Sequence, residues 1–152
     1  MYPSTFLAER MRSALALRPC MRLVSAVLKT TEYNRSWTVG YGRTYSVGPG
    51  SRIAIVPIGY GDGYRRALSN RGYALVHGKR VPVCGRVSMD MITLDVTELP
   101  EAVQVGDEVV LLGRQEWKDR SDEISAEEMA QQIGTISYEI TCGITPRVPR
   151  IY

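Results

Sequence analysis

The chain has 152 residues, 44% of them hydrophobic, which fits one globular domain with its own core. Its 19 basic and 16 acidic residues give a net charge of only +3, so charge favours neither nucleic acid nor an anionic membrane as a partner. No apolar run approaches the roughly 18 residues of a membrane span, and the first residues do not form a secretion signal, so we expect a cytoplasmic protein.

The first predicted element is an amphipathic helix in "STFLAERMRSALAL". Apolar residues recur at helical spacing between Phe6 and Leu15. Ser4 or Thr5 can cap the start of the helix, and Pro19 ends it.

From Met21 onward the pattern changes to short runs rich in Val, Ile, Thr and Tyr, separated by Gly, Pro and Asn. The runs are "RLVSAVLKTTEY", "WTVGYGRTYSV", "RIAIVPIGY", "YALVHGKRVPV", "CGRVSMDMITLDVT" and "DEVVLLG". Their even spacing predicts a mainly β domain, an antiparallel barrel or a sandwich-like fold. Within it, "ALVHGKRVPV" is typical of a tight hairpin, and a loop enters the last of these strands through Gly106 and Asp107.

In the second run, "VGYGRTYSV", Tyr41 stands between Gly40 and Gly42 and is followed two residues later by Arg43. The glycines are compatible with two purposes, and both remain open. They can supply the positive φ of a turn or bulge, with Tyr41 as a strand aromatic. Alternatively, they bare the backbone so that something approaches the tyrosine hydroxyl closely. Taken alone, the pattern favours the first interpretation.

The segment "IGYGDGYRR" superficially resembles a phosphate-binding loop. Its glycines do not have the G-x-G-x-x-G spacing, and no Gly-Lys-Ser/Thr follows. The segment does place Tyr60, Asp62 and Tyr64 on one loop. An Asp-Gly turn with solvated charges explains it as well as a functional loop does.

The segment "GRVSMDM" alternates like a strand, with Arg86, Ser88 and Asp90 on one face. Arg86 and Asp90, which have opposite charges, form either a surface ion pair or the charged lining of a cleft. Spacing alone favours the ion pair.

Two short helices are predicted near the C-terminus. Ser125 and Glu128 form a capping box for "SAEEMAQQIG", which Gly134 ends. The next segment, "TISYEITCGI", has features of both a strand and a helix, and we expect a helix. The proline-rich "PRVPRIY" is expected to run extended along an edge or the surface.

The cysteines and the histidine of the chain exclude several common kinds of metal and catalytic site. Cys20, Cys84 and Cys142 are odd in number and widely spaced, so we expect buried free thiols in place of disulfides or a zinc site. The one histidine, His77, lies in a predicted turn, which leaves no histidine-based metal site and no Ser-His-Asp triad. We expect no bound metal.

Taken in order, "VGYGRTY", "VPIGYGDGYRRALSNRG", "GKRVPVCGRVSMDMITLDVT", "ISAEEMAQQIGTISYEI" and "RVPRIY" resemble the C-terminal half of alanine racemase. The resemblance implies a fold-type III enzyme that uses pyridoxal phosphate and works as a head-to-tail homodimer. Residues 1–20 would be the helical end of an N-terminal barrel and a linker, and residues 21–152 the C-terminal β domain. A (β/α)8 barrel needs about 250 residues, so the barrel itself is absent, as in an isolated domain or a truncated product.

The resemblance also implies roles for seven residues. Tyr41 matches the catalytic tyrosine; Met89 and Asp90 match residues beside the substrate carboxylate; Tyr60, Arg86 and Ile136 match the corridor by which substrate reaches the site; and Tyr138 matches a tyrosine near the cofactor phosphate.

Racemisation explains why such a tyrosine is needed. A proton leaves Cα on one face and returns on the other, and two opposed bases achieve this in a rigid site. The cofactor supplies the electron sink. A phenol has a pKa of about 10, so its ionised form needs support from a cation such as Arg43 or from the barrel. The flanking glycines would then let the Tyr41 loop press against the cofactor pocket of the other subunit.

The lysine that binds the cofactor belongs to the missing barrel. Lys29, Lys79 and Lys118 lie in a predicted strand, turn and loop and are no substitutes for it. We therefore expect this chain alone neither to bind pyridoxal phosphate tightly nor to interconvert L- and D-alanine, the peptidoglycan precursor. Two alternatives remain: a non-enzymatic β-barrel interaction module, and the same domain of a racemase acting on serine or another small amino acid.

Overall fold

The structure is a computed structural model that describes residues 18–152. The helix predicted within residues 4–17 lies outside the described residues. The proposed boundary between residues 20 and 21 stays a prediction.

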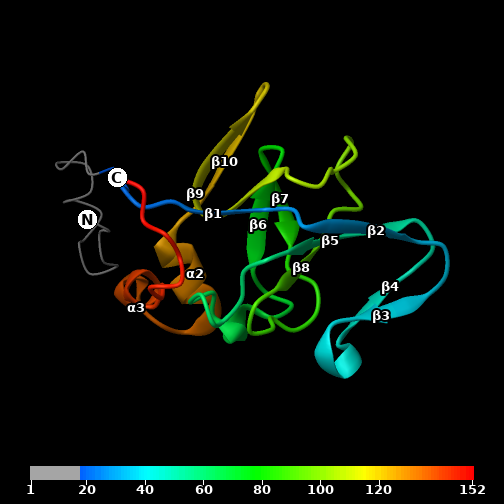
Figure 1. The fold of residues 1–152 in the computed structure, drawn as a ribbon, viewed down its shortest axis with the longest axis horizontal. Helices are drawn as coiled ribbons and strands as arrows, with labels where there is room; N and C mark the ends of the chain where they lie inside the picture. The colour runs from blue at the N-terminus through cyan, green and yellow to red at the C-terminus, as the bar shows by residue number, and fades with distance from the viewer. Residues whose placement is uncertain (1–17) are drawn as a thin grey trace.

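The described chain folds into three antiparallel sheets and two short α-helices (Figure 1). The largest sheet contains β1 (Leu23–Ala26), β6 (Tyr73–Val76), β7 (Lys79–Pro82), β9 (Glu108–Trp117) and β10 (Arg120–Ile124). The second sheet contains β2 (Lys29–Tyr33), β5 (Ser51–Val56) and β8 (Ile92–Asp95). The third is a hairpin of β3 (Trp37–Val39) and β4 (Tyr45–Val47). The arrangement confirms a mainly β, antiparallel fold, which is sandwich-like and not a closed barrel.

One hydrophobic core joins the two larger sheets. Ala54 and Val56 of β5 and Leu94 of β8 pack in one cluster with Leu75 of β6 and Leu111 of β9, and all five are completely buried. Burial of a Val or Leu side chain stabilises the fold by about 1.5–3 kcal/mol. The two sheets are therefore layers of a single domain.

A smaller cluster fastens the β3–β4 hairpin to this body. Val39, Val47, Ile53 and Cys84 are buried together under the hairpin. The hydroxyl of Tyr45 on β4 donates to Asp95 Oδ2 at 2.7 Å. Figure 1 shows the hairpin, in cyan, projecting from one end of the molecule.

Local chemistry explains the first of the two helices near the C-terminus. Helix α2 (Ala126–Ile133) begins where Ser125 Oγ accepts the N–H of Glu128 at 3.1 Å, and it ends at Gly134, whose φ is 72°. The capping prediction is confirmed. Helix α3 (Ser137–Cys142) follows, so the ambiguous segment is helical, as expected.

Other local predictions are confirmed. The β6–β7 hairpin turns at His77 and Gly78, whose φ angles of 51° and 68° are the left-handed conformations of a tight hairpin. The loop that passes through Gly106 and Asp107 leads directly into β9.

The prediction that "GRVSMDM" forms a strand is wrong. Residues 85–91 form a loop, and β8 begins only at Ile92. Gly85 has a φ of 79°, and Ser88 Oγ both accepts the N–H of Met91 at 3.0 Å and donates to its carbonyl oxygen at 2.8 Å. These bonds close a turn, so the side chains of residues 86, 88 and 90 do not share a strand face.

Two further expectations need correction. The run from Leu23 to Tyr33 is interrupted at Val27, whose N–H donates to Asp107 and whose carbonyl accepts from Gly106, so β1 and β2 belong to different sheets. Only Cys84 is buried, whereas Cys20 and Cys142 are exposed.

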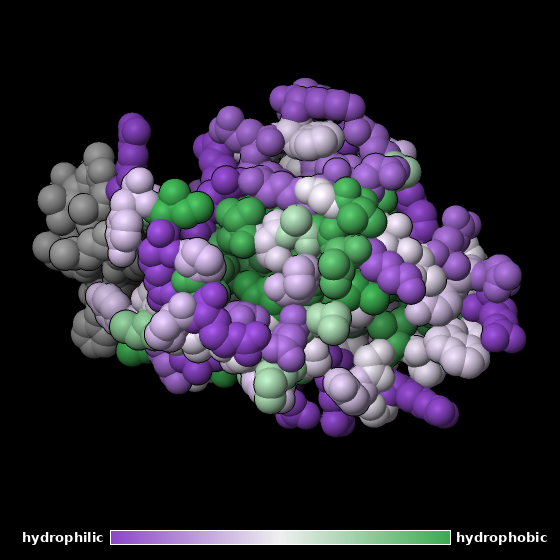
Figure 2. Space-filling view, in the orientation of Figure 1, coloured by the Kyte–Doolittle hydropathy of each residue, from purple (hydrophilic) through white to green (hydrophobic). Residues whose placement is uncertain are grey.

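The surface is not uniformly polar. Figure 2 shows apolar side chains gathered over the middle of the molecule, in the region of β5, β6 and β8, between polar margins. The described residues include no candidate for a membrane-spanning helix.

Candidate active site

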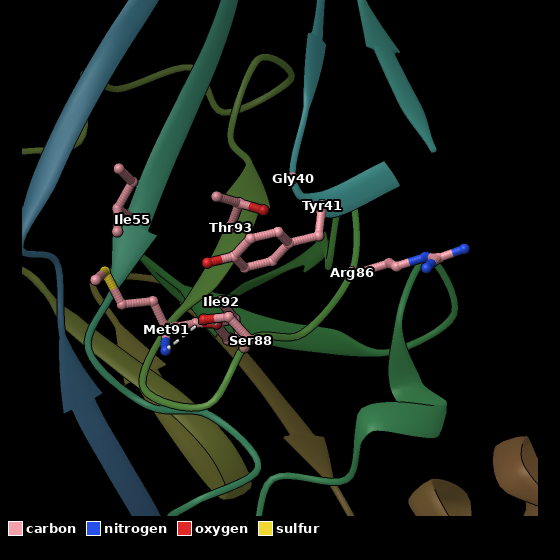
Figure 3. A pocket seen from close by; sticks show the side chains of 8 residues that line it. All are labelled: Gly40, Tyr41, Ile55, Arg86, Ser88, Met91, Ile92 and Thr93. Atoms are coloured by element: carbon pink, nitrogen blue, oxygen red, sulfur yellow. Dashed lines mark hydrogen bonds between the residues drawn. The ribbon is translucent and has the colours of Figure 1, made fainter. Parts of the chain in front are cut away.

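The β3–β4 hairpin carries Tyr41 at its tip. The tip is a 3-10 turn, η1 (Tyr41–Arg43), and the tyrosine side chain is 73% exposed. Its hydroxyl makes no hydrogen bond within residues 18–152. In Figure 3 the ring lies over a concavity and its oxygen points toward Ile55 and Met91, away from the guanidinium of Arg86.

The concavity beneath the Tyr41 ring measures about 360 Å³. Its lining consists of Gly40, Tyr41, Ile55, Arg86, Ser88, Met91, Ile92 and Thr93. The isoleucines and the methionine make an apolar surface, and the hydroxyls of Ser88 and Thr93 add polar groups. The site is thus an apolar hollow with few polar groups, which is the usual character of a small-molecule site.

The two glycines around Tyr41 have a conformational and a packing purpose. Gly40 and Gly42 adopt φ angles of 76° and 72°, so the interpretation as a positive-φ turn is confirmed. A Cβ on Gly40 would lie 3.0 Å from the backbone nitrogen of Arg86, and one on Gly42 would lie 3.2 Å from the Arg86 guanidinium carbon. The room that these glycines leave is therefore occupied by Arg86 of the same chain.

A second loop brings Tyr60 against residues 88–90. The N–H of Tyr60 donates to Ser88 O at 3.0 Å, and the N–H of Gly61 donates to Met89 O at 2.9 Å. A Cβ on Gly59 would fall 2.3 Å from Ser88 O, so only glycine permits this approach. The predicted residues Tyr60, Met89 and Asp90 are all exposed and lie on these two paired loops.

Arg147 ties these loops together and was not found from the sequence. Its guanidinium pairs with Asp90 Oδ1 at 2.7 Å and with Asp62 Oδ1 at 3.2 Å. The hydrogen bond to Asp90, and then the charge of Asp62, raise the pKa of Arg147. Asp62 Oδ2 also accepts the N–H of Gly59 at 2.9 Å. Because "PRVPRIY" is remote in sequence from both carboxylates, no local signal points to this contact.

Ile136 and Tyr138 lie at the start of α3 and are 60% and 46% exposed. Helix α3 is joined to the Tyr60 loop because Arg65 Nη2 donates to Glu139 O at 2.7 Å. Just beyond the helix, the N–H of Thr145 donates to Asp62 O at 3.0 Å. The predicted site residues therefore come from three adjoining loops and one helix, although no hydrogen bond or ion pair joins Tyr41 to Tyr138 in the described chain.

Two nearby tyrosines are held as neutral phenols. Burial first, and then the carboxylate of Asp95, raise the pKa of Tyr45 above its usual range. Burial raises the pKa of Tyr64, which is 1% exposed and packs in the main core. Neither of these tyrosines is as exposed as Tyr41.

Three lysines outside the candidate site were considered from the sequence. None of Lys29, Lys79 and Lys118 lines the concavity at Tyr41, and Lys118 Nζ is paired with Glu101 at 2.9 Å. Residues 18–152 also hold no group of three metal-ligating side chains.

Comparison with known proteins finds one family. The sequence model described as "Alanine racemase, C-terminal domain" matches residues 20–152. "Alanine racemase 2" of Caldanaerobacter subterraneus subsp. tengcongensis is 45% identical over 151 residues, which cover 99% of this chain and 37% of that protein. The chain thus spans little more than a third of the length of this relative.

Solved structures agree with the sequence match. The alanine racemase of Clostridium difficile in complex with cycloserine superposes with a TM-score of 0.86 at 36% identity, covering 100% of this chain and 37% of that one. The alanine racemase of Bartonella henselae with covalently bound pyridoxal phosphate has a TM-score of 0.78 at 32% identity, covering 86% of this chain and 34% of that one.

Proposed function

The chain belongs to the alanine racemase family, as its C-terminal domain, and on that premise we propose that it supplies Tyr41 to the active site of a racemase that interconverts L- and D-alanine. The barrel of a second subunit, in a head-to-tail homodimer, holds the rest of that site. The observation that supports this proposal most directly is the exposure of Tyr41, 73%, at the tip of a projecting hairpin.

In this proposal, the hydroxyl oxygen of Tyr41 gives a proton to the substrate Cα on one face and takes it back in the reverse direction. A phenol with a pKa of about 10 is a poor base at neutral pH, so its ionised form needs a positive charge nearby. Arg43 is on the same turn, and the guanidinium of Arg86 lies against Gly42. The remaining support would come from the barrel.

The other predicted residues would surround the substrate. Met89 and Asp90 lie beside its carboxylate, with Met89 acting mainly through its backbone. The access corridor is lined by Tyr60, Arg86 and Ile136, and Tyr138 lies near the cofactor phosphate. All these side chains are exposed, on adjoining loops and at the start of α3, which supports this assignment.

Pyridoxal phosphate belongs, in this proposal, to the barrel of the full-length enzyme, because the described residues offer no lysine at the candidate site. We expect this chain alone neither to bind the cofactor tightly nor to racemise alanine. The measurement is an absorbance spectrum of the purified chain after incubation with pyridoxal phosphate and desalting. A retained visible band would contradict the expectation.

Complementation tests the role of Tyr41. A separately produced racemase barrel domain is mixed with this chain, and formation of D-alanine from L-alanine is measured. We expect activity with the unchanged chain and a loss of at least about 100-fold with Tyr41→Phe. Tyr73→Phe is the matched control, because Tyr73 is also exposed but lies on β6. Equal activity with Tyr41→Phe and the unchanged chain would reject the role of Tyr41. The same assay with serine tests the alternative substrate.

The alternative of a self-sufficient interaction module predicts a monodisperse chain with few exposed apolar patches. Figure 2 instead shows apolar side chains over the middle of one face, which supports a domain that packs against another. Sedimentation of the purified chain, with and without the barrel domain, separates the two cases.

A further inference from the structure

The turn that carries Tyr41 is weakly held by its own bonds. Its backbone closes through one long hydrogen bond, from the N–H of Arg43 to Gly40 O at 3.3 Å. Gly40, Gly42 and Arg43 all have positive φ, and for Arg43, at 52°, this conformation is strained. None of residues 41–43 is buried. The β3–β4 ladder closes the hairpin at Val39 and Tyr45, and beyond this pair the turn depends on contacts from elsewhere.

The Arg86 guanidinium lies against Gly42 of this turn, and the side chain of Asn70 forms a hydrogen bond at its end. The Nδ2 of Asn70 donates to Thr44 Oγ1 at 3.0 Å, at the residue where η1 ends. The Oδ1 of Asn70 accepts the N–H of Gly85 at 2.6 Å, and the backbone N–H of Asn70 donates to Gly85 O at 3.2 Å. Asn70 itself has a φ of 56°, which asparagine tolerates better than most residues.

Gly85 in turn lies directly against the beginning of the turn. Its φ is 79°, and a Cβ there would fall 3.0 Å from Val39 O and 3.3 Å from Gly40 Cα. Asn70 therefore holds both ends of the Tyr41 turn: it holds Gly85, which packs against the start, and it bonds Thr44 at the end.

We propose that Asn70, with Thr44 and Gly85, forms a clamp that sets the position of the Tyr41 hydroxyl; the proposal rests on the function proposed for Tyr41. The Tyr41 hydroxyl has no hydrogen bond of its own in the described chain, so its position depends on the turn that carries the side chain. Misplacing a reacting group by about 1 Å lowers a rate by about 100-fold. Asn70 is a positioning residue in this proposal and does not touch the substrate.

The test uses three threonine variants of this full chain. Thr44→Val removes the hydroxyl that Asn70 bonds and keeps the side-chain shape, whereas Thr44→Ser retains that hydroxyl. Thr38→Val is the matched control, because Thr38 lies on the same hairpin and makes no side-chain hydrogen bond in the described chain. Asn70→Gly removes the clamping side chain and still permits a positive φ.

The first readout is amide hydrogen exchange of residues 40–44 in the chain alone, which does not depend on racemase activity. We expect Thr44→Val and Asn70→Gly to speed this exchange by roughly fivefold, and Thr44→Ser and Thr38→Val to leave it near the original rate. Unchanged exchange in both Thr44→Val and Asn70→Gly overturns the proposal. Because Thr44→Val is conservative, the test survives if Asn70→Gly fails to fold.

The second readout is kinetics after mixing with the barrel domain. We expect Thr44→Val to lower kcat about tenfold with little change in KM, and Thr44→Ser to restore it. Faster amide exchange of residues 40–44 together with an unchanged kcat would overturn the proposal that the clamp positions the Tyr41 hydroxyl. If Tyr41→Phe and the unchanged chain give equal activity with the barrel domain while exchange responds as expected, the function of Tyr41 is rejected and the hold of Asn70 on the turn is supported.

Discussion

The chain contains the tripeptide Gly-Tyr-Gly twice, and the two copies use their glycines for different physical reasons. At residues 40–42 both glycines have positive φ, and added Cβ atoms would meet neighbours at 3.0 and 3.2 Å. At residues 59–61 neither glycine has positive φ, but added Cβ atoms would fall 2.3 Å from Ser88 O and 2.4 Å from Arg147 Nη1. The first copy needs a backbone conformation, and the second needs space.

The two loops also differ in how many hydrogen bonds hold them and in how exposed their tyrosines are. The Tyr60 loop is bonded to residues 88–89 through two backbone N–H groups, and its tyrosine is 43% exposed. The Tyr41 turn has only one long internal bond, and its tyrosine is 73% exposed. The same tripeptide therefore occurs in one loop that is bonded to the rest of the domain and in another that extends its tyrosine into solvent.

The largest loss of stability is expected at Gly59, where there is no space for a side chain. Gly59→Ala would place a methyl group against the backbone oxygen of Ser88, which no side-chain rotation relieves. We expect the free energy of unfolding to fall by about 3 kcal/mol, at the upper end for overpacking. Urea unfolding measures it.

Gly48→Ala is the control for Gly59→Ala, since nothing lies within 4 Å of a Cβ there and its φ is not positive. It should be neutral or stabilising by up to about 1 kcal/mol. Comparable losses from the two variants would contradict the spatial explanation.

A smaller effect is expected at the Tyr41 turn. Gly40→Ala should cost about 1–2 kcal/mol, because a φ of 76° with a ψ of 174° is a backbone conformation that is essentially confined to glycine. Gly50→Ala, at a φ of 83° with nothing within 4 Å, carries the strain without the contact. Gly40→Ala should therefore unfold at a lower urea concentration than Gly50→Ala, and only Gly40→Ala should change amide exchange near Arg86. Identical exchange maps would show that the contact with Arg86 is unimportant.

The features predicted correctly from the sequence depend on neighbours along the chain. The cap at Ser125, the stop at Gly134 and the turn at His77 each involve residues a few positions apart, and such chemistry can be read locally. The loop at residues 85–91 was misjudged because alternation alone outweighed Gly85, whose φ of 79° turns the chain. Strand β10 was missed because its sequence, "RSDEI", is mostly polar and depends on pairing with β9.

The residues of the candidate site also differ in whether the sequence could indicate them. Tyr41 and the other predicted residues came from a family resemblance, and their roles remain predictions. Arg147 and Asn70 were missed, because Arg147 meets Asp90 across 57 residues and Asn70 meets Thr44 across 26. A sequence can indicate that Asn70 favours a turn, but only the packed structure brings it to the end of the Tyr41 hairpin.

Cys84 is buried in one cluster with Val39 and Val47 of the Tyr41 hairpin. The pH dependence of the unfolding free energy therefore reports whether the hairpin covers this thiol. Burial raises the pKa of Cys84 from 9.0 to about 12. The folded state therefore keeps its proton when the unfolded state has lost it, so the stabilisation is full below pH 9 and is lost as the pH rises from 9 to 12.

Relative to Cys84→Ala, the chain should lose about 1 kcal/mol of unfolding free energy between pH 8 and pH 10. Urea unfolding of both proteins at the two pH values measures this difference, and other ionisable groups cancel. Parallel pH dependence in the two proteins would mean that the hairpin leaves Cys84 open to solvent.

The smallest effect is expected from Arg147→Gln, which asks whether charge or backbone bonding holds the Tyr60 loop. Arg147 is half-exposed where it pairs with Asp62 and Asp90, and exposed ion pairs contribute little. The backbone bonds of Tyr60 and Gly61 remain in the variant. Amide exchange at Gly61 should therefore rise by less than about twofold, with Arg114→Gln, which removes a surface pair with Glu116, as the control. A rise of about tenfold or more, reproduced by high salt in the unchanged chain, would show that this loop too is held from outside, and the contrast with the Tyr41 turn would fail.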